Sequence, residues 1–195
     1  MRTIQHGRHT LPKRLLNGPA AAQFAGADRI PRSERRDSYV STTVSGTHVM
    51  SESGDAIRRL MNEYCFRIDA GDLEGFAALF AHGIWWVQGD PTGRAIGTAA
   101  VRERLAKVIL YNGKPNTKHV MTNVEVNVDE PGVHATAQCY ITVFQAVPPD
   151  FPLQPIFSGH YHDRFERVDG CWRFALREIS PDLLGDLSRH RADMA

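Results

Sequence analysis

The chain has 195 residues, of which 42% are hydrophobic and 23% are charged, and its formal net charge is +1. These values are ordinary for a globular protein, so they exclude a fibrous repeat and a chain that is disordered throughout. The length supports one or two domains, and we expect one domain with a substantial core. Three cysteines without CxxC spacing indicate a reducing compartment and argue against a disulfide framework or a zinc site.

Charge is unevenly distributed along the chain. Residues 1–50 hold eight Lys or Arg and three acidic residues, a net charge of +5, which leaves −4 for the other 145 residues. Because large apolar residues are few in this segment, we predict a disordered extension, with nucleic-acid binding, a transit peptide and a true start at Met50 as alternatives. No apolar run in it is long enough for a secretory signal or a membrane span. We therefore expect a cytoplasmic protein that binds neither membranes nor nucleic acids.

The first half of the remaining chain has the apolar spacing of helices. A first amphipathic helix is predicted, with Ser51 or Ser53 as its N-cap and Gly71 just after its end. Asp72 is expected to cap a short second helix, and Thr98 a third. The buried face of the first helix is predicted to consist of Ile57, Leu60, Met61, Tyr64, Cys65 and Ile68, and that of the third of Val101, Leu105, Val108 and Ile109.

From Lys118 onward the apolar period changes to two, which is typical of strands, and Asp169-Gly170 is a strong hairpin signal. Strands are predicted at 84–88, 118–128, 133–147, 156–168 and 171–179. Residues 51–182 thus predict an α+β domain, a cone-shaped curved antiparallel sheet packed against three N-terminal helices and enclosing a pocket. For residues 183–195 we predict a C-terminal helix or tail.

Asp69 and His119 are the candidates for acid–base chemistry. Asp69 lies at the border of the apolar stripe of the first helix, so its carboxylate can face whatever that stripe covers. Strict alternation places His119 opposite the valines of its strand, so one interpretation has the valines in the core and His119 in water. The alternative has the His119 face lining the cavity with Asp69 across it. A carboxylate on one ring nitrogen fixes the tautomer and stabilises the imidazolium, which suits a general base.

Other motifs are less informative. His160 and His162 share one strand face in the stretch HYHD, but no third ligand has a suitable spacing, so we predict no metal site. The sequence contains no phosphate loop, no dinucleotide-binding fingerprint and no motif for a Ser or Cys nucleophile.

The order of elements resembles the SnoaL-like branch of the nuclear transport factor 2-like superfamily. The stretches YCFRIDAGDLEGFAALF, IGTAAVRERL, KHVMTNVEV and GHYHDRFERVDGCWRFALREI carry the resemblance, over residues 53–180. It implies a cone of curved sheet with an apolar pocket for small cyclic molecules, and lyase or isomerase activity without a cofactor. We also expect a homo-oligomer, a dimer or a trimer.

The same resemblance implies roles for individual residues. Asp69 and His119 match the Asp-His dyad of the family's dehydratases and dehydrochlorinases. Tyr64 matches a tyrosine of its bile-acid enzymes, and Arg177 matches a catalytic arginine of its dehydrochlorinases. Gln145 stands where scytalone dehydratases have a second histidine. The residues that we expect to contact substrate are Trp86, Met121, Phe144, Gln145, Phe157 and Tyr161.

We therefore predict a dehydratase-like lyase or an isomerase that acts on a hydrophobic cyclic substrate such as a steroid, a polyketide or an aromatic compound. One alternative is a non-catalytic ligand-binding module or a structural subunit of an aromatic-ring dioxygenase. Another is an enzyme similar to ketosteroid isomerase, with Tyr64 as hydrogen-bond donor and Asp90 as base. A plain turn role for Asp90, ahead of Pro91, is the competing interpretation.

Overall fold

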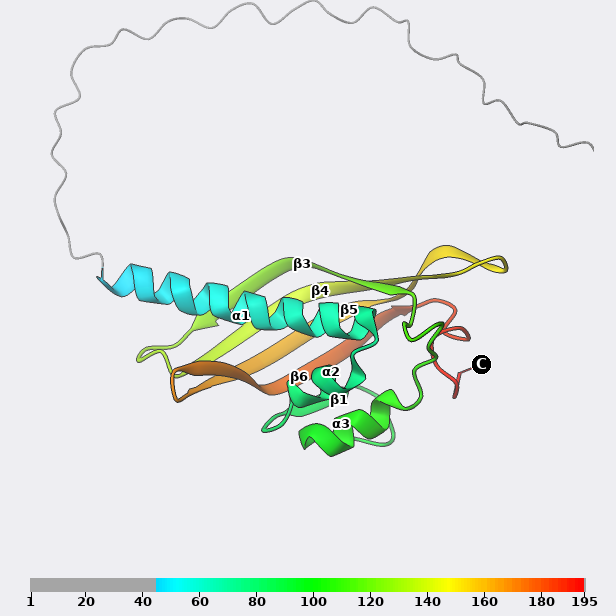
Figure 1. Cartoon of the computed structure of the whole chain (residues 1–195). Helices are drawn as coiled ribbons and strands as arrows, with labels where there is room; N and C mark the ends of the chain where they lie inside the picture. Colours follow the sequence, from blue (N-terminus) through cyan, green and yellow to red (C-terminus); the bar gives the residue numbers. More distant parts are fainter. Residues whose placement is uncertain (1–44, 195) are drawn as a thin grey trace, which may run out of the picture. The chain divides into compact units, whose positions relative to one another are not determined.

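The computed structural model describes the backbone of residues 45–194 and side chains from residue 52 onward (Figure 1). Residues 1–44 of the extension predicted for residues 1–50 lie outside the described residues. The predictions of disorder, nucleic-acid binding and a transit peptide concern that part. In residues 45–194 no helix combines enough length and apolar character to cross a membrane.

Three helices precede most of the sheet: α1 (Ser45–Ala70), α2 (Leu73–Ala78) and α3 (Gly97–Leu105). The predicted end of α1 is confirmed, because Gly71 has a φ of +80° and its N–H bonds to the carbonyl of Ile68 at 3.0 Å. The predicted cap of α2 is also confirmed, since the Asp72 carboxylate accepts a hydrogen bond of 2.9 Å from the backbone N–H of Gly75.

Two helix boundaries differ from the prediction. The helix α1 begins at Ser45, before the predicted caps at Ser51 and Ser53. The helix α3 begins at Gly97 with no side-chain cap, so Thr98 is not its N-cap, and it ends at Leu105. Val108 and Ile109 therefore lie outside α3, where they contact the C-terminal part of the chain through backbone pairs.

The α+β fold class is confirmed. The six strands are β1 (Ile84–Val87), β2 (Ala95–Ile96), β3 (Thr117–Val128), β4 (His134–Val147), β5 (Phe151–Val168) and β6 (Cys171–Leu184). They form one curved sheet in the order β2-β1-β6-β5-β4-β3, which does not close into a barrel. Its pairs are antiparallel except one, because β1 runs parallel to β6. The predicted hairpin turn is confirmed, with positive φ at both Asp169 and Gly170.

Strand β3 departs from strict alternation in a way that decides where His119 points. Its pairing with β4 shifts register between Thr122 and Glu125, where Asn123 has a φ of +55°. This β-bulge reverses the phase of the strand. Before the bulge, Thr117, His119 and Met121 face inward, and after it Val124 and the two later valines do. The interpretation that places His119 in water is therefore wrong, although the three later valines do pack against the core.

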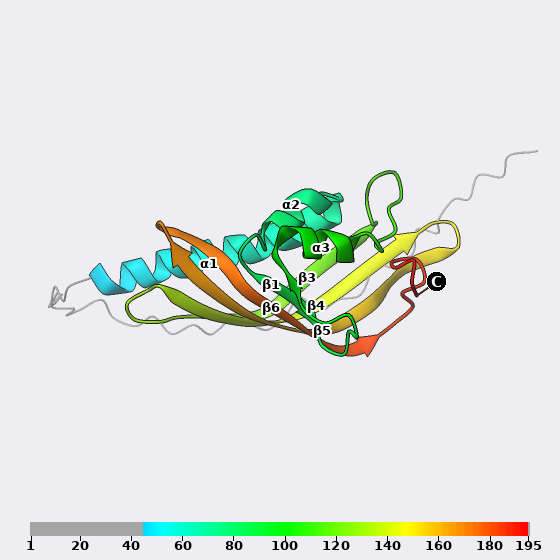
Figure 2. The same ribbon diagram turned by 90° about the horizontal axis from the view of Figure 1, so that it is seen from below.

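All three helices lie on the same face of the sheet, as Figures 1 and 2 show together, and α1 contacts both β3 and β6. The predicted apolar face of α1 packs onto the inner sheet surface, with Ile57 and Met61 fully buried. Burial of this stripe stabilises the fold by roughly 1.5–3 kcal/mol for each large side chain. The core therefore lies between α1 and the sheet. The inward-facing side chains of β3, β5 and β6 line it.

The last residues form no helix within the described part of the chain. Strand β6 continues to Leu184, and residues 185–194, here called the closing segment, form turns that bond to the stretch after α3. The N–H of Ile109 donates to the carbonyl of His190, and the N–H of Ala192 donates to the carbonyl of Lys107, both at 2.9 Å. These bonds fix the closing segment beside residues 107–109.

Candidate active site

The carboxylate of Asp69 and the imidazole of His119 are in direct contact. Asp69 Oδ1 lies 2.7 Å from His119 Nδ1, and Asp69 Oδ2 accepts a hydrogen bond of 2.9 Å from the backbone N–H of His119. The hydroxyl of Thr117 donates to Oδ1 at 2.7 Å. The side chains of His119 and Asp69 are only 8% and 9% exposed. One carboxylate thus ties the last turn of α1 to the start of β3.

A glycine explains why these two elements meet. Gly71 adopts a left-handed conformation that glycine reaches without strain, and a Cβ added to it would lie 1.9 Å from the carbonyl oxygen of Gly113. The turn at 111–114 therefore packs directly against the end of α1. Because β3 begins three residues after that turn, its first residues come within reach of Asp69.

The geometry fixes the chemical roles of the dyad. A carboxylate only accepts hydrogen bonds, so His119 Nδ1 carries the proton and Nε2 is the basic nitrogen of the neutral ring. No described residue hydrogen-bonds to Nε2. Burial opposes ionisation of Asp69, but the bonds from the ring and backbone of His119 and from Thr117 outweigh it, so the pKa of Asp69 lies below its ordinary value. Asp69 is thus ionised at neutral pH and positioned to stabilise an imidazolium.

Tyr64 lies between the dyad and Arg177. Its ring centroid is 6.4 Å from that of His119 in an edge-to-face arrangement, and the Arg177 guanidinium carbon is 4.1 Å from the centroid of the Tyr64 ring. Trp85 Nε1 donates a hydrogen bond of 3.2 Å to the Tyr64 hydroxyl. Burial raises the pKa of Tyr64, so the phenol keeps its proton at neutral pH and remains a donor. The structure therefore gathers Tyr64, Asp69, His119 and Arg177 in one region.

Arg177 is fully buried and paired with a carboxylate that the sequence interpretation had not assigned. Its Nε and Nη2 donate to the two oxygens of Asp163 at 2.9 and 2.6 Å, and neither side chain is exposed. Burial alone would lower the pKa of Arg177, but Asp163 raises it above its ordinary value. The pair is thus close to neutral as a unit. The third guanidinium nitrogen, Nη1, is buried without a hydrogen-bond partner among the described residues.

The sequence contained a signal for Asp163, but a bulge concealed it. Counting back from the Asp169-Gly170 turn places Asp163 on β5 near Arg177 on β6. The register shifts by one residue between the pairs Phe165 to Phe174 and Arg164 to Leu176, and this shift sets Asp163 directly opposite Arg177. Without the bulge, Asp163 would have been assigned Leu176 as its partner.

The predicted substrate contacts divide between the two faces of the sheet. Tyr161 and Gln145 are buried, and Met121 and Phe157 pack against the core from the inner face. Trp86 and Phe144 differ from the prediction. They alternate with the buried Trp85 and Gln145, so they point to the outer face, and the guanidinium of Arg94 lies 4.8 Å from the Trp86 ring centroid. The inner set is Met121, Gln145, Phe157 and Tyr161.

Two surface hollows, of about 290 and 330 Å³, lie on the outer face of the sheet. Their walls include Gln138 and His162, whose side chains alternate away from the core. Neither hollow includes a residue of the dyad. Inside the sheet, side chains fill the space beside Arg177, because Tyr64, Tyr161 and Phe174 all lie against its guanidinium. In the described part of the chain, no group of three or more His, Cys, Asp and Glu side chains could hold a metal ion.

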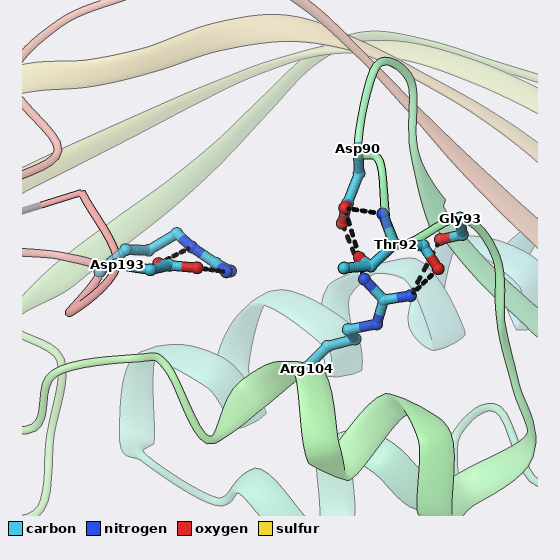
Figure 3. Close-up of polar contacts among 6 residues, drawn as sticks. Asp90, Thr92, Gly93, Arg104 and Asp193 are labelled. Atoms are coloured by element: carbon cyan, nitrogen blue, oxygen red, sulfur yellow. Dashed lines mark hydrogen bonds and ion pairs between the residues drawn. The ribbon is translucent and has the colours of Figure 1, made fainter.

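Asp90 has a structural environment. Its carboxylate accepts hydrogen bonds from the backbone and the hydroxyl of Thr92, and from Arg104 Nη1 at 3.0 Å (Figure 3). Arg104 also donates to the carbonyl oxygens of Thr92 and Gly93, which closes the turn. Burial raises the pKa of Asp90, but the Thr92 hydrogen bonds and Arg104 together outweigh it, so the pKa lies below its ordinary value. This geometry favours the turn role of Asp90 over a role as a base.

Comparison with known proteins places the chain in a family. The model of the SnoaL-like domain matches residues 49–178. The chain belongs to the SnoaL-like family. The matched range contains Tyr64, Asp69, His119, Asp163 and Arg177, while the closing segment lies beyond it. No curated protein matches the chain in sequence.

Solved structures share the fold. An NTF2-like protein with a cystatin-like fold from Novosphingobium aromaticivorans is 24% identical, with a TM-score of 0.60 over 71% of this chain and 87% of that one. A putative scytalone dehydratase from the same species is 23% identical, with a TM-score of 0.58 over 72% and 91%. A hexachlorocyclohexane dehydrochlorinase from Novosphingobium barchaimii is 17% identical, with a TM-score of 0.59 over 72% and 93%. At these identities the likeness concerns the fold of this SnoaL-like chain.

Proposed function

We propose that this SnoaL-like protein is a cofactor-independent lyase or isomerase that removes a proton from a hydrophobic cyclic molecule. The observation that carries the proposal is the contact between Asp69 and His119, a 2.7 Å pair in which Nδ1 is held and Nε2 is left without a hydrogen-bond partner among the described residues. The solved dehydratase and dehydrochlorinase structures with the same fold support the reaction class.

In the proposed reaction His119 Nε2 takes a proton from a ring carbon, and Asp69 stabilises the imidazolium that forms. In an elimination, the electron pair of the broken C–H bond forms a C=C bond and the leaving group departs with its own bonding pair. In an isomerisation, that pair forms a C=C bond while the π pair of a neighbouring carbonyl moves onto its oxygen, and the imidazolium then returns the proton to another carbon as the carbonyl re-forms. We assign the protonated Tyr64 and the unpartnered Nη1 of Arg177 as donors for the negative charge that develops.

The pairing with Asp163 determines how Arg177 would contribute. Because Asp163 occupies two of its nitrogens and balances its charge, Arg177 supplies one hydrogen bond rather than a free positive charge. A preorganised donor of this kind contributes roughly 100- to 1,000-fold to the rate when it binds developing charge in a dry site. Arg177 also holds Tyr64 in place by stacking on its ring.

Exchange of carbon-bound hydrogen for deuterium tests the proposal without knowledge of the full reaction. The purified chain is incubated in D₂O with cyclic ketones, including a steroid ketone and 2-tetralone, and loss of the proton signal next to the carbonyl is followed by NMR. We expect exchange with at least one ketone, and a loss of about 100- to 10,000-fold in His119→Gln. A folded His119→Gln protein that keeps more than a tenth of the rate contradicts the proposal.

The chain supplies a matched control in His134. It forms the same contact, Nδ1 to a carboxylate oxygen of Asp129 at 3.2 Å, but its side chain is 71% exposed. His134→Gln removes an imidazole held by a carboxylate without touching the buried dyad. We expect unchanged exchange in this variant, so a similar loss in both variants would mean that the reaction is not catalysed at the buried dyad.

A non-catalytic function is the second candidate, as a ligand-binding module or as a structural subunit of an aromatic-ring dioxygenase. The observation that favours it is the position of both hollows on the outer face of the sheet, where a partner chain could dock. An enzyme of the proposed kind should purify as a self-sufficient homo-oligomer, a dimer or a trimer, with exchange activity. A chain that is insoluble alone, or that shows no exchange and binds a partner, supports the second candidate.

A further inference from the structure

The closing segment is anchored beside the dyad by a buried amide. Gln145 on β4 is fully buried, and its Nε2 donates to the carbonyl oxygens of Pro115 and Arg189, both at 2.9 Å. Gln145 pairs directly with Thr117 in the β3–β4 ladder, and Thr117 donates to Asp69. Since paired residues share a face, the carbonyl of Arg189 is held next to the dyad.

These bonds also orient the amide of Gln145. Two carbonyl oxygens can only be bonded by its NH₂ group, so the positions of Nε2 and Oε1 are unambiguous. The oxygen Oε1 is buried and has no hydrogen-bond partner among the described residues. A buried acceptor without a partner is rare in native proteins and needs an explanation.

The residue after Arg189 brings a second imidazole to the dyad. His190 is fixed through its backbone, by its carbonyl to Ile109 and its N–H to Leu187, both at 2.9 Å. Its ring is close enough to His119 and Asp69 for both to affect its pKa. Its Nδ1 is buried without a hydrogen-bond partner among the described residues. Burial, together with the nearby His119 and Arg191, lowers the pKa of His190 to about 4, so this ring is neutral at pH 7.

We propose that His190 and Gln145 form an oxygen-binding subsite of the dyad, in which His190 Nδ1 and Gln145 Oε1 hydrogen-bond a hydroxyl or carbonyl group of the ring compound. The subsite rests on the proposed function only in that the ring compound is the substrate of the dyad. Such a subsite selects a cyclic hydroxy or keto compound as substrate rather than a hydrocarbon or a halocarbon. His190 lies outside the matched SnoaL-like range, so this specificity belongs to the closing segment of this chain.

The chemistry of the two atoms supports this class. A neutral imidazole nitrogen donates or accepts according to its tautomer, and the amide oxygen accepts only. Together they satisfy a hydroxyl, which both donates and accepts, while the donor tautomer of Nδ1 alone satisfies a carbonyl. A compound without oxygen would leave both atoms unpaired in a dry site, which lowers its affinity.

The test compares matched probes in the full-length protein by NMR titration. The oxygen-bearing probes are 2-naphthol and 2-tetralone, and the matched hydrocarbons are naphthalene and tetralin. We expect the wild type to prefer the oxygen-bearing member of each pair, and His190→Leu to weaken only that member, by about 5- to 30-fold, the value of one hydrogen bond in a buried site. His190→Gln, which keeps a hydrogen-bonding group, should recover part of the preference.

The outcomes separate the subsite from the proposed reaction. Equal weakening of both members of a pair, no change in either, or failure of both oxygen-bearing probes to bind the wild type overturns the subsite. His190→Leu should fold, because it replaces a buried polar atom that has no partner with an apolar group of similar size. His134→Leu, at an exposed site, should leave all affinities unchanged. Absence of deuterium exchange with the oxygen preference intact overturns the proposed reaction and leaves the subsite in place.

Discussion

Replacing Asp69 by Asn tests how the site is built, because the change keeps the shape of the side chain and removes its charge. Asp69 accepts three hydrogen bonds, two at Oδ1 and one at Oδ2. An amide has one acceptor oxygen and one NH₂ group. If the NH₂ group takes the place of Oδ2, it faces the backbone N–H of His119, and if it takes the place of Oδ1, it faces the ring and the Thr117 hydroxyl.

In the first orientation the backbone N–H of His119 loses its acceptor, which costs about 1–3 kcal/mol. In the second, the bonds survive only if the ring moves its proton to Nε2 and the Thr117 hydroxyl turns to accept. The bonds that survive lose their ionic character, and a bond to a charged group is worth about 1 kcal/mol more than a neutral one. We therefore expect Asp69→Asn to lower the free energy of unfolding by about 2–4 kcal/mol at pH 7. Because the folded pKa of Asp69 is lowered, the stability due to its charge is present above the ordinary value of 3.8 and is lost as the pH falls through the folded pKa.

Urea denaturation of the wild type and the variant measures this difference. The control is Asp129→Asn on the protein surface, where a carboxylate accepts from the backbone N–H groups of Val133 and His134 and lies 3.2 Å from His134 Nδ1. A comparable set of donors, two backbone N–H groups and an imidazole, is there open to solvent, so we expect a much smaller change. A loss below about 1 kcal/mol in Asp69→Asn, or one no larger than in the control, would refute the description of Asp69 as a buried tie between α1 and β3.

Three further predictions concern Arg177, Gly71 and His190. Arg177→Met should destabilise the fold by about 3–5 kcal/mol in urea denaturation, because it leaves the Asp163 charge buried alone, and adding Asp163→Leu should recover much of that loss; two additive losses would contradict it. Gly71→Ala should lower the free energy of unfolding by about 1–3 kcal/mol, and with it the melting temperature, because alanine is strained at this positive φ and its Cβ would clash with Gly113. An unchanged melting temperature would count against the close approach of Gly71 to Gly113. Because the pKa of His190 is lowered from 6.5 to about 4, stability from this residue is complete above pH 6.5 and declines by up to about 3 kcal/mol toward pH 4. In His190→Gln this decline should disappear, and an identical pH profile would contradict the burial of the ring.

The sequence was informative where a periodic pattern met a local signal. The apolar stripe of α1 and the glycine after it placed Asp69 correctly at the inner edge of the helix end. The Asp169-Gly170 turn fixed the β5–β6 hairpin because few other residue pairs reach the backbone angles that this turn needs. Such signals are local, so they do not depend on knowing the rest of the fold.

The β-bulges could not be predicted from the sequence, and they changed the position of two site residues. The one at Asn123 reversed the face of His119, and the one between β5 and β6 exchanged the partner of Asp163. An extra residue in a strand leaves composition and overall periodicity nearly unchanged, so a single sequence does not reveal it. His190 was missed for a different reason. It approaches the dyad only because residues far apart in the chain, Gln145 and Ile109, hold the closing segment there.

The central claim is that Asp69 holds Nδ1 of His119 and leaves Nε2 as the basic nitrogen. Nitrogen-15 NMR of the histidine rings above pH 7 measures this directly, because the shifts of the two nitrogens show which one carries the proton. The account predicts that neutral His119 has its proton on Nδ1, and that Asp69→Asn abolishes this preference. A His119 ring protonated on Nε2, or one unaffected by Asp69→Asn, would contradict it.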